Sequence, residues 1–329
     1  MKHRSRFRAA TPVSIAGRSG LTDRGKTMAP VPGATRRSTP DPAPCTAGDV
    51  ERRYESRDGL SLCYRDYDDG GEGWPLLCIP GLSRNSRDFH RLALALRPAR
   101  RVLAVDLRGR GLSDYDPDGD NYRLPTYVAD IAGLMRHAGI DRAVVLGTSL
   151  GGVVAMMLAS EQPAKVAGLV LNDIGPEIAR AGLARIREQA GRFGPVWSWD
   201  EACAQTREIH GHALPDLDDA RWMEYTRAAY REGPDGVPRL DLDPRIGERP
   251  ARPGDLPDPW TMFSSLSMPT LVLRGEHSDI LTRETAERMQ AQTPELELAT
   301  VAGRGHAPLL DESDSLAALE AFLARADAL

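Results

Sequence analysis

The stretch at residues 144–157 constrains this chain most, because an apolar, β-branched run enters a glycine-rich turn and an apolar run of small residues leaves it. The turn places Ser149 in a G-x-S-x-G-G pattern with Gly147, Gly151 and Gly152. A sharp turn from strand to helix exposes a serine hydroxyl and directs the N–H of the next residue, Leu150, toward a reacting atom. Glycines are needed where strand and helix approach closely. The stretch predicts a nucleophilic serine, and the alternative is a structural turn with an idle serine.

Length and charge limit the class of protein. A chain of 329 residues can bury a full core, and one large domain with an insertion suits this length better than three small ones. The net charge of −5 and the pI near 5.9 argue against nucleic acid as the main partner. We expect a small-molecule substrate, and a monomer or a homodimer.

Residues 1–48 differ from the rest of the chain. They carry nine Lys and Arg against two Asp, contain six prolines and show neither helical nor strand periodicity. The uncharged stretch 9–17 is interrupted by polar residues and proline, so it makes a poor signal-peptide core. We expect a disordered basic extension. The alternatives are an organelle transit peptide and a translation start at Met28.

The cysteines and the one long uncharged run indicate a cytoplasmic protein without a membrane span. Cys45, Cys63, Cys78 and Cys203 are scattered without metal-like or C-x-x-C spacing, which is typical of reduced thiols. The run 143–160 approaches the length of a membrane span. Its turn glycines and its place in an alternating series predict a buried strand and helix instead.

From residue 50 onward, predicted strands and helices alternate. Such alternation implies right-handed crossovers and a mostly parallel sheet covered on both faces. A D-G turn at 57–59 predicts a hairpin between the first two strands. The predicted strands are 52–56, 60–66, 75–79, 101–107, 144–146, 166–171, 270–273 and 296–301, and the predicted helices include 88–96, 126–137, 283–292 and 315–326.

An interruption at 175–267 has a different composition. It holds four of the five tryptophans, and the segments 178–190, 200–210 and 218–231 read as helices. An insertion after a strand of an open parallel sheet lies above the carboxyl edge, where ligands bind. We therefore expect a helical cap. Its aromatic residues, Trp197 and Trp222 among them, either form a small core of their own or also line an apolar part of a substrate pocket.

These features together resemble the α/β-hydrolase fold over about residues 50–329. The resemblance rests on the serine turn, on Pro80-Gly81-Leu82, on the loop 106–113 and on a late Gly-His pair. It implies an α/β fold with a mostly parallel eight-stranded sheet and helices on both faces. The core would comprise residues 49–174 and 268–329, with the cap at 175–267.

The resemblance also implies a serine, an acid and a histidine in that order along the chain, the last two each after a late strand. Ser149, Asp279 and His306 fill these places. The alternative acid is Asp173, because some members carry the acid after the preceding strand; read structurally, Asp173 holds the cap hinge. His210 and His212 form an H-x-H pair in the cap, but no set of Cys or carboxylate ligands accompanies them, and we expect no metal.

An oxyanion needs two aligned donors. One would be the N–H of Leu150, and the resemblance implies the N–H of Leu82 as the other. Many relatives have His-Gly where this chain has Pro80-Gly81. Arg84, in the polar loop that follows, is either a ligand for a substrate carboxylate or a solvated loop charge.

The resulting hypothesis is a serine hydrolase that cleaves a carboxylic ester or lactone through an acyl-enzyme, without a cofactor. A serine nucleophile argues against the dehalogenases and epoxide hydrolases of this fold, which attack through a carboxylate. The alternatives are a carbon–carbon bond hydrolase, an acyltransferase, a cofactor-free haloperoxidase and a ligand-binding member without catalysis.

Overall fold

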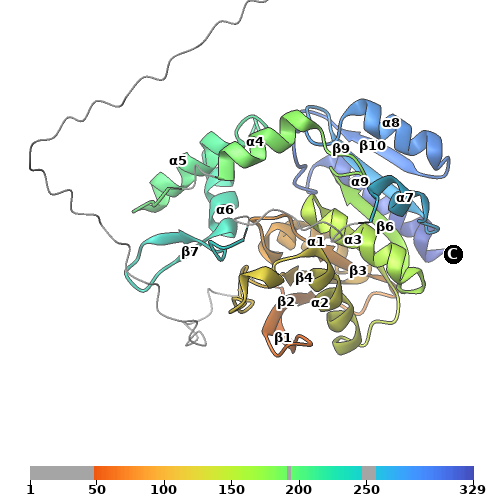
Figure 1. Cartoon of the computed structure of the whole chain (residues 1–329), viewed down its shortest axis with the longest axis horizontal. Helices are drawn as coiled ribbons and strands as arrows, with labels where there is room; N and C mark the ends of the chain where they lie inside the picture. Colours follow the sequence, from red (N-terminus) through yellow and green to blue (C-terminus); the bar gives the residue numbers. More distant parts are fainter. Residues whose placement is uncertain (1–47, 191–193, 247–256) are drawn as a thin grey trace, which may run out of the picture. The chain divides into compact units, whose positions relative to one another are not determined.

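The computed structural model describes residues 48–190, 194–246 and 257–329. Its centre is an eight-stranded sheet in the order β1-β2-β4-β3-β5-β6-β9-β10 (Figure 1). Strand β2 is antiparallel to both β1 and β4, and all other pairs are parallel. The strands are β1 Val50–Glu55, β2 Ser61–Tyr67, β3 Gly73–Ile79, β4 Arg100–Asp106, β5 Ala143–Thr148, β6 Val166–Asn172, β9 Thr270–Gly275 and β10 Glu297–Val301. The predicted fold class and the predicted hairpin are confirmed.

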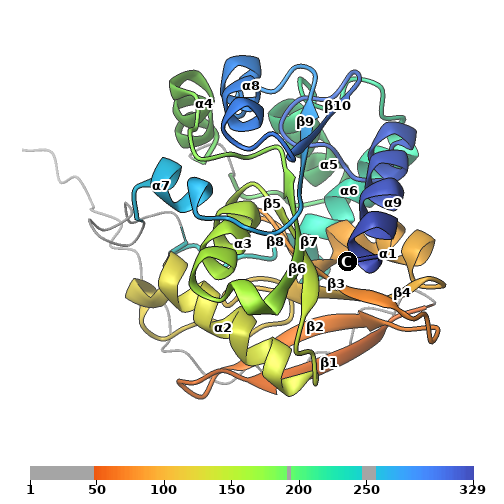
Figure 2. The same ribbon diagram turned by 90° about the vertical axis from the view of Figure 1, so that its right-hand side faces the viewer.

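Helices cover both faces of this sheet (Figure 2). One face carries α1 (His90–Leu96) and α9 (Ser313–Asp327), whose apolar side chains share one core cluster. The other face carries α2 (Leu124–His137), α3 (Leu150–Glu161), α7 (Pro259–Ser264) and α8 (Arg283–Gln292), which contribute to a second cluster. Both faces of the central strands are therefore buried, which explains why these strands read as continuous apolar runs rather than as alternating ones.

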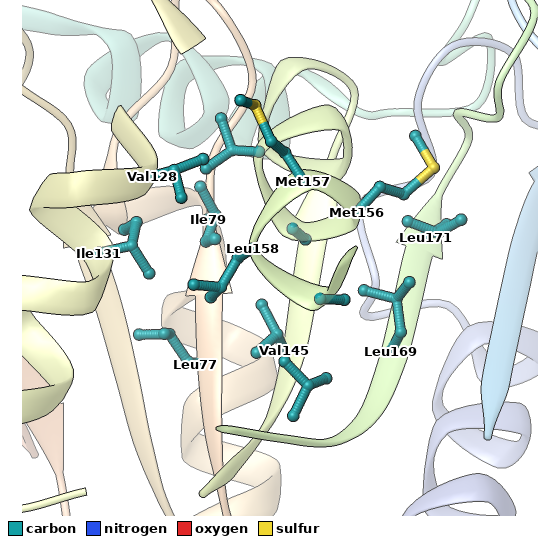
Figure 3. Packing of buried hydrophobic residues seen from close by; sticks show 14 of the residues in the cluster. Leu77, Ile79, Val128, Ile131, Val145, Met156, Met157, Leu158, Leu169 and Leu171 are labelled. Atoms are coloured by element: carbon teal, nitrogen blue, oxygen red, sulfur yellow. The ribbon is translucent and has the colours of Figure 1, made fainter. Parts of the chain in front are cut away.

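The second cluster fixes the helix that follows the serine turn. In Figure 3, Val145 of β5 faces Leu158 of α3, and Leu169 and Leu171 of β6 lie on the side of Met156. Val128 and Ile131 of α2 lie beside Leu77 and Ile79 of β3. Fully burying one such side chain contributes roughly 1.5–3 kcal/mol. The helix that begins at the turn is thus held rigidly against the sheet.

Between β6 and β9 the chain forms α4 (Arg180–Ala190), α5 (Trp199–His210), α6 (Asp219–Ala229) and the short hairpin β7 (Tyr230–Glu232) with β8 (Pro238–Leu240). In Figure 1, α5, α6 and β7 lie to the left of the sheet. Two small apolar clusters lie in this segment, and one of them also includes Leu309, which precedes α9. The assignment of this segment as a cap stays a prediction. Helix α7 instead packs against α3 and contributes Met262 and Phe263 to the second cluster, which lies between α3 and the sheet.

Three further predictions concern the cysteines, the N-terminal extension and membrane spans. Cys63, Cys78 and Cys203 are free thiols, and Cys45 lies outside the described residues. The predicted disordered extension also lies outside them, except for Gly48. Within the described ranges, every helix is too short or too polar to span a bilayer.

Candidate active site

Ser149 occupies the sharp turn that its sequence pattern predicts. β5 ends at Thr148, α3 begins at Leu150, and Ser149 between them has φ 51° and ψ −116°. A Cβ atom on Gly151 would lie 2.1 Å from the carbonyl oxygen of Ile79, so the close approach of helix and strand requires glycine there. A non-glycine residue at positive φ stores about 1–3 kcal/mol of strain, which the surrounding packing must offset.

His306 contacts this serine although 157 residues separate the two in sequence. Its Nε2 lies 2.9 Å from Ser149 Oγ, and its Nδ1 lies 2.7 Å from Asp173 Oδ2. The ring follows β10, at the carboxyl edge of the sheet where Ser149 also lies. One imidazole therefore connects a hydroxyl to a carboxylate.

Asp173 is fully buried, with 0% of its surface exposed, and directly follows β6. Its Oδ1 accepts a hydrogen bond from Gly275 N–H at 2.8 Å, and its Oδ2 accepts one from Ser278 Oγ at 2.6 Å in addition to the His306 contact. Ser278 Oγ itself accepts from Ile280 N–H and Leu281 N–H at 3.2 and 3.0 Å. Since its lone pairs are engaged, the Ser278 hydroxyl hydrogen points at Asp173.

The expectation that Asp279 is the carboxylate paired with His306 is wrong. Asp279 accepts two hydrogen bonds from Arg185 of α4, at 2.5 and 2.7 Å. Burial raises the pKa of Asp279, but the hydrogen bonds and charge of Arg185 outweigh burial and hold that pKa below its usual value. The alternative residue, Asp173, occupies the place because β6 borders β5, the strand that leads to Ser149.

Of the two residues expected to supply oxyanion donors, Leu150 directly follows Ser149, and Leu82 directly follows Gly81, which lies close to Ser149. The N–H of Leu150 is in the first turn of α3, where no helical hydrogen bond uses it. Leu82 lies in the loop after β3, which ends at Ile79, and a Cβ on the preceding Gly81 would lie 3.7 Å from the Cβ of Ser149. The carbonyl oxygen of Leu82 accepts a 2.6 Å hydrogen bond from Arg110 Nε.

Arg84 is not a solvated loop charge. Only 8% of it is exposed, and its Nε and Nη2 donate to the carboxylate of Asp88 at 2.7 and 2.6 Å. Its guanidinium also lies 3.9 Å from the ring centroid of Tyr225 on α6. The side chain thus ties the loop after β3 to α6, and a role for it as a substrate ligand stays a prediction.

The two cap tryptophans differ in position. Trp197 is 70% exposed, whereas Trp222 is buried among Ala213, Leu214 and Leu309. Trp222 therefore packs against the loop that carries His306, and Trp197 lies at the protein surface.

The loop between α5 and α6 contacts the His306 loop directly. Gly305 N–H donates to the carbonyl oxygen of Ala213 at 2.8 Å, and Arg304 Nη1 lies 2.5 Å from Asp216 Oδ1.

Burial, followed by the charge of nearby Arg84, lowers the pKa of His210 to about 3, so this imidazole is neutral at pH 7. Within the described ranges, no three His, Cys, Asp or Glu side chains are placed to hold a metal ion.

Residues 76–319 match the model of the alpha/beta hydrolase family. The chain belongs to this family. A 3-hydroxybutyrate-oligomer hydrolase from Cupriavidus necator is 31% identical over 273 residues, which cover 79% of this chain and 92% of that protein. A 2-hydroxymuconate semialdehyde hydrolase from Pseudomonas putida is 28% identical over 286 residues, or 83% and 95% of the two chains.

Solved structures agree with this assignment. The crystal structure of an alpha/beta hydrolase from Novosphingobium aromaticivorans superposes with a TM-score of 0.80 at 42% identity, covering 85% of this chain and all of that one. The protein is therefore an enzyme of the hydrolase class, as its sequence predicts.

The sequence predicts no role for two residues near the site, Ser278 and Arg110. Ser278 follows β9 directly ahead of Asp279, and a hydroxyl at the end of a neighbouring strand is a signal that could have favoured Asp173. Arg110 belongs to the 106–113 loop, whose residues Asp106, Arg108 and Ser113 read as scaffold.

Proposed function

We propose that this alpha/beta hydrolase cleaves carboxylic esters through an acyl-enzyme, with Ser149 as nucleophile, His306 as general base and Asp173 as its acidic partner. The hydrogen-bonded chain from Ser149 Oγ through His306 to Asp173, at 2.9 and 2.7 Å, is the observation that carries this proposal. A base within hydrogen-bond reach of the nucleophile, itself oriented by a third group, is the general arrangement for nucleophilic catalysis.

The reaction proceeds in two halves. His306 Nε2 takes the proton of Ser149 Oγ as the oxygen attacks the ester carbonyl carbon, and the N–H groups of Leu82 and Leu150 bind the resulting oxyanion. Asp173 accepts from His306 Nδ1–H, which fixes the tautomer and stabilises the imidazolium. The imidazolium then protonates the departing alkoxide. In the second half His306 activates water, which attacks the acyl-enzyme and releases the acid.

The substrate class that we propose is an ester of a small, partly apolar hydroxy acid. This proposal is supported by the relative named as a 3-hydroxybutyrate-oligomer hydrolase, because this chain covers 92% of that protein. Carbon–carbon bond hydrolysis is the second candidate, supported by the relative named as a 2-hydroxymuconate semialdehyde hydrolase. The cytoplasmic location and the oligomeric state stay predictions.

The test has two parts. A fluorophosphonate probe should label the native protein stoichiometrically at Ser149, and Ser149→Ala should abolish both the labelling and the burst of p-nitrophenol from p-nitrophenyl butyrate. A linear 3-hydroxybutyrate trimer and a vinylogous 1,5-diketone are then compared as substrates by kcat/KM. A folded protein that takes no label contradicts the serine mechanism. Preference for the diketone would contradict ester cleavage in favour of the second candidate.

A further inference from the structure

Arg110 is a buried cation that no carboxylate of the described residues contacts. None of its surface is exposed, and it forms no ion pair within the part of the chain that the structure describes. Its Nη1 donates to the carbonyl oxygen of Arg108 at 3.0 Å and to Tyr127 Oη at 3.3 Å, while its Nη2 has no hydrogen-bond partner among residues 48–190, 194–246 and 257–329. Burying a charge and leaving a donor unpaired both cost free energy. Stability alone therefore does not explain an arginine at this position.

A neighbouring arginine shows the contrast. Arg108, two residues earlier and equally buried, donates to the carboxylates of Asp58, Asp116 and Asp130 at distances from 2.5 to 3.1 Å. That set is a compensated ion cluster with a structural role. The shortest contact of Arg110 is instead the 2.6 Å hydrogen bond from Nε to the carbonyl oxygen of Leu82.

Leu82 lies between two peptide groups that are each held by a hydrogen bond. The carbonyl oxygen of Gly81, which shares a peptide plane with Leu82 N–H, accepts from Arg84 N–H at 3.3 Å. The next carbonyl, that of Leu82, is held by Arg110. At the far end of the same loop, Ser86 N–H donates to Asp106 Oδ1 at 2.7 Å. Arg110 is thus the contact nearest to Leu82 that connects this loop to the 106–113 loop.

We propose that Arg110 is a positioning residue that orients the N–H of Leu82 toward the oxyanion. This inference rests on the proposed function, because it assigns a role to Leu82 in that reaction. A donor stabilises the oxyanion only when it is aimed at the place where charge develops, and a displacement of about 1 Å can reduce the rate on the order of 10²-fold. Loss of the Arg110 hydrogen bond frees the Leu82 carbonyl and lets the peptide before it tilt.

The experiment compares Arg110→Met with a matched control, Arg100→Met. Arg100 is also a buried arginine, 5% exposed, and it donates to Asp327 and to the Trp74 carbonyl at the amino end of β4, away from the site. For each variant we would measure kcat and KM for p-nitrophenyl butyrate, the affinity for a trifluoromethyl ketone that forms a tetrahedral oxyanion adduct, and the thermal midpoint.

Arg110→Met should lower kcat on the order of 10²-fold with KM within about threefold, and it should weaken the trifluoromethyl ketone by a similar factor. Arg110→Lys, which keeps a charge and a donor, should recover about tenfold of that loss. Arg100→Met should lower the thermal midpoint and leave kcat unchanged. A purely structural role for Arg110 would instead lower the midpoint without weakening the ketone selectively.

Two results would overturn the inference. One is a kcat for Arg110→Met within threefold of the wild-type value, and the other is an equal kcat loss in Arg100→Met. If Arg110→Met fails to fold, wild-type affinity of Arg110→Lys for the ketone refutes the role and weaker affinity supports it. Failure of the proposed function itself is distinguishable, because the wild-type protein would then take no fluorophosphonate at Ser149.

Discussion

Replacing Asp173 by asparagine separates the two candidate acids, because the amide is nearly the same size and only the hydrogen-bonding pattern changes. Gly275 N–H donates to one carboxylate oxygen, and Ser278 and His306 donate to the other. An asparagine has one acceptor and one donor in these places. If its oxygen stays with Gly275, its NH₂ group faces His306 Nδ1, which must then give up its proton in order to accept.

The imidazole in that variant carries its proton on Nε2, the atom 2.9 Å from Ser149 Oγ, and so cannot take the serine proton. The opposite orientation places the NH₂ group against Gly275 N–H and leaves a buried donor unpaired, which costs about 1–3 kcal/mol. The orientation in which the amide NH₂ group faces His306, and the ring carries its proton on Nε2, is therefore favoured. In a serine protease triad the same exchange lowers kcat about 10⁴-fold, which corresponds to roughly 5.4 kcal/mol in the activation barrier.

The matched control is Asp279→Asn, which removes a partly exposed ion pair with Arg185 and leaves the Asp173–His306 contact intact. Such pairs contribute about 0–1 kcal/mol to stability, so the variant should stay folded. Because the Asp279 carboxylate binds Arg185 and His306 contacts Asp173 instead, kcat should stay within about threefold of the wild-type value. Burst kinetics with p-nitrophenyl butyrate, well below the thermal midpoint of each variant, measure both changes. A loss in Asp279→Asn as large as that in Asp173→Asn would refute the assignment.

Three further changes probe the site and the fold. Ser278→Ala removes one donor to Asp173 and should lower kcat about tenfold with KM unchanged, because the carboxylate loses part of its orientation. Stopped-flow measurement of acylation tests this effect. An unchanged acylation rate would show that the Ser278 hydroxyl has no such role. Hydrogen bonds from Arg91 lower the folded-state pKa of Glu224 to about 2, below its unfolded value, so its stabilisation is complete above about pH 5 and is lost as the pH falls toward 2. At pH 7 the free energy of unfolding of Glu224→Gln should therefore lie below the wild-type value by less than about 1 kcal/mol, because the pair is half exposed, and the difference, followed by thermal unfolding, should close near pH 2. A gap that widens in acid contradicts this sign. Gly151→Ala would place a Cβ 2.1 Å from a backbone carbonyl and should lower the free energy of unfolding, measured in urea, by more than about 3 kcal/mol. Gly133→Ala in α2 meets only ordinary contacts and should raise that free energy by about 0.5–1 kcal/mol. Equal effects of the two changes would disprove the packing explanation.

The sequence predicts the sheet well because its central strands are apolar on both faces and glycine or aspartate marks their ends. The helix at 283–292 agrees with α8 to the residue. The hairpin β7–β8 is missed, since each of its strands has three residues and no alternation can be recognised over so short a length. Its Gly233-Pro-Asp-Gly236 turn was the available signal.

The site shows where sequence reasoning ends. The prediction pairs Ser149 with His306, and the two are in contact, because few histidines follow a strand in a glycine-rich loop. Asp173 and Asp279 both follow strands that end at the same edge, and spacing alone does not reveal which carboxylate faces the ring. That choice depends on sheet order and on the Arg185 partner that α4 supplies. Arg84 and Arg110 were beyond prediction for a related reason, since a loop arginine reads as solvated until the cap is placed over it.

The hydrogen bond from Gly305 to Ala213 has a practical consequence for engineering. Exchanging the inserted helices for those of a homologue is an obvious way to change substrate preference, but the main chain at position 213 accepts a hydrogen bond from Gly305, the residue immediately before His306. A graft that omits the stretch around Ala213, or shifts it by one position, would remove this hydrogen bond and so disturb the position of the His306 ring. Chimaeras should therefore keep residues 210–216 native and vary α4 and α6 around them.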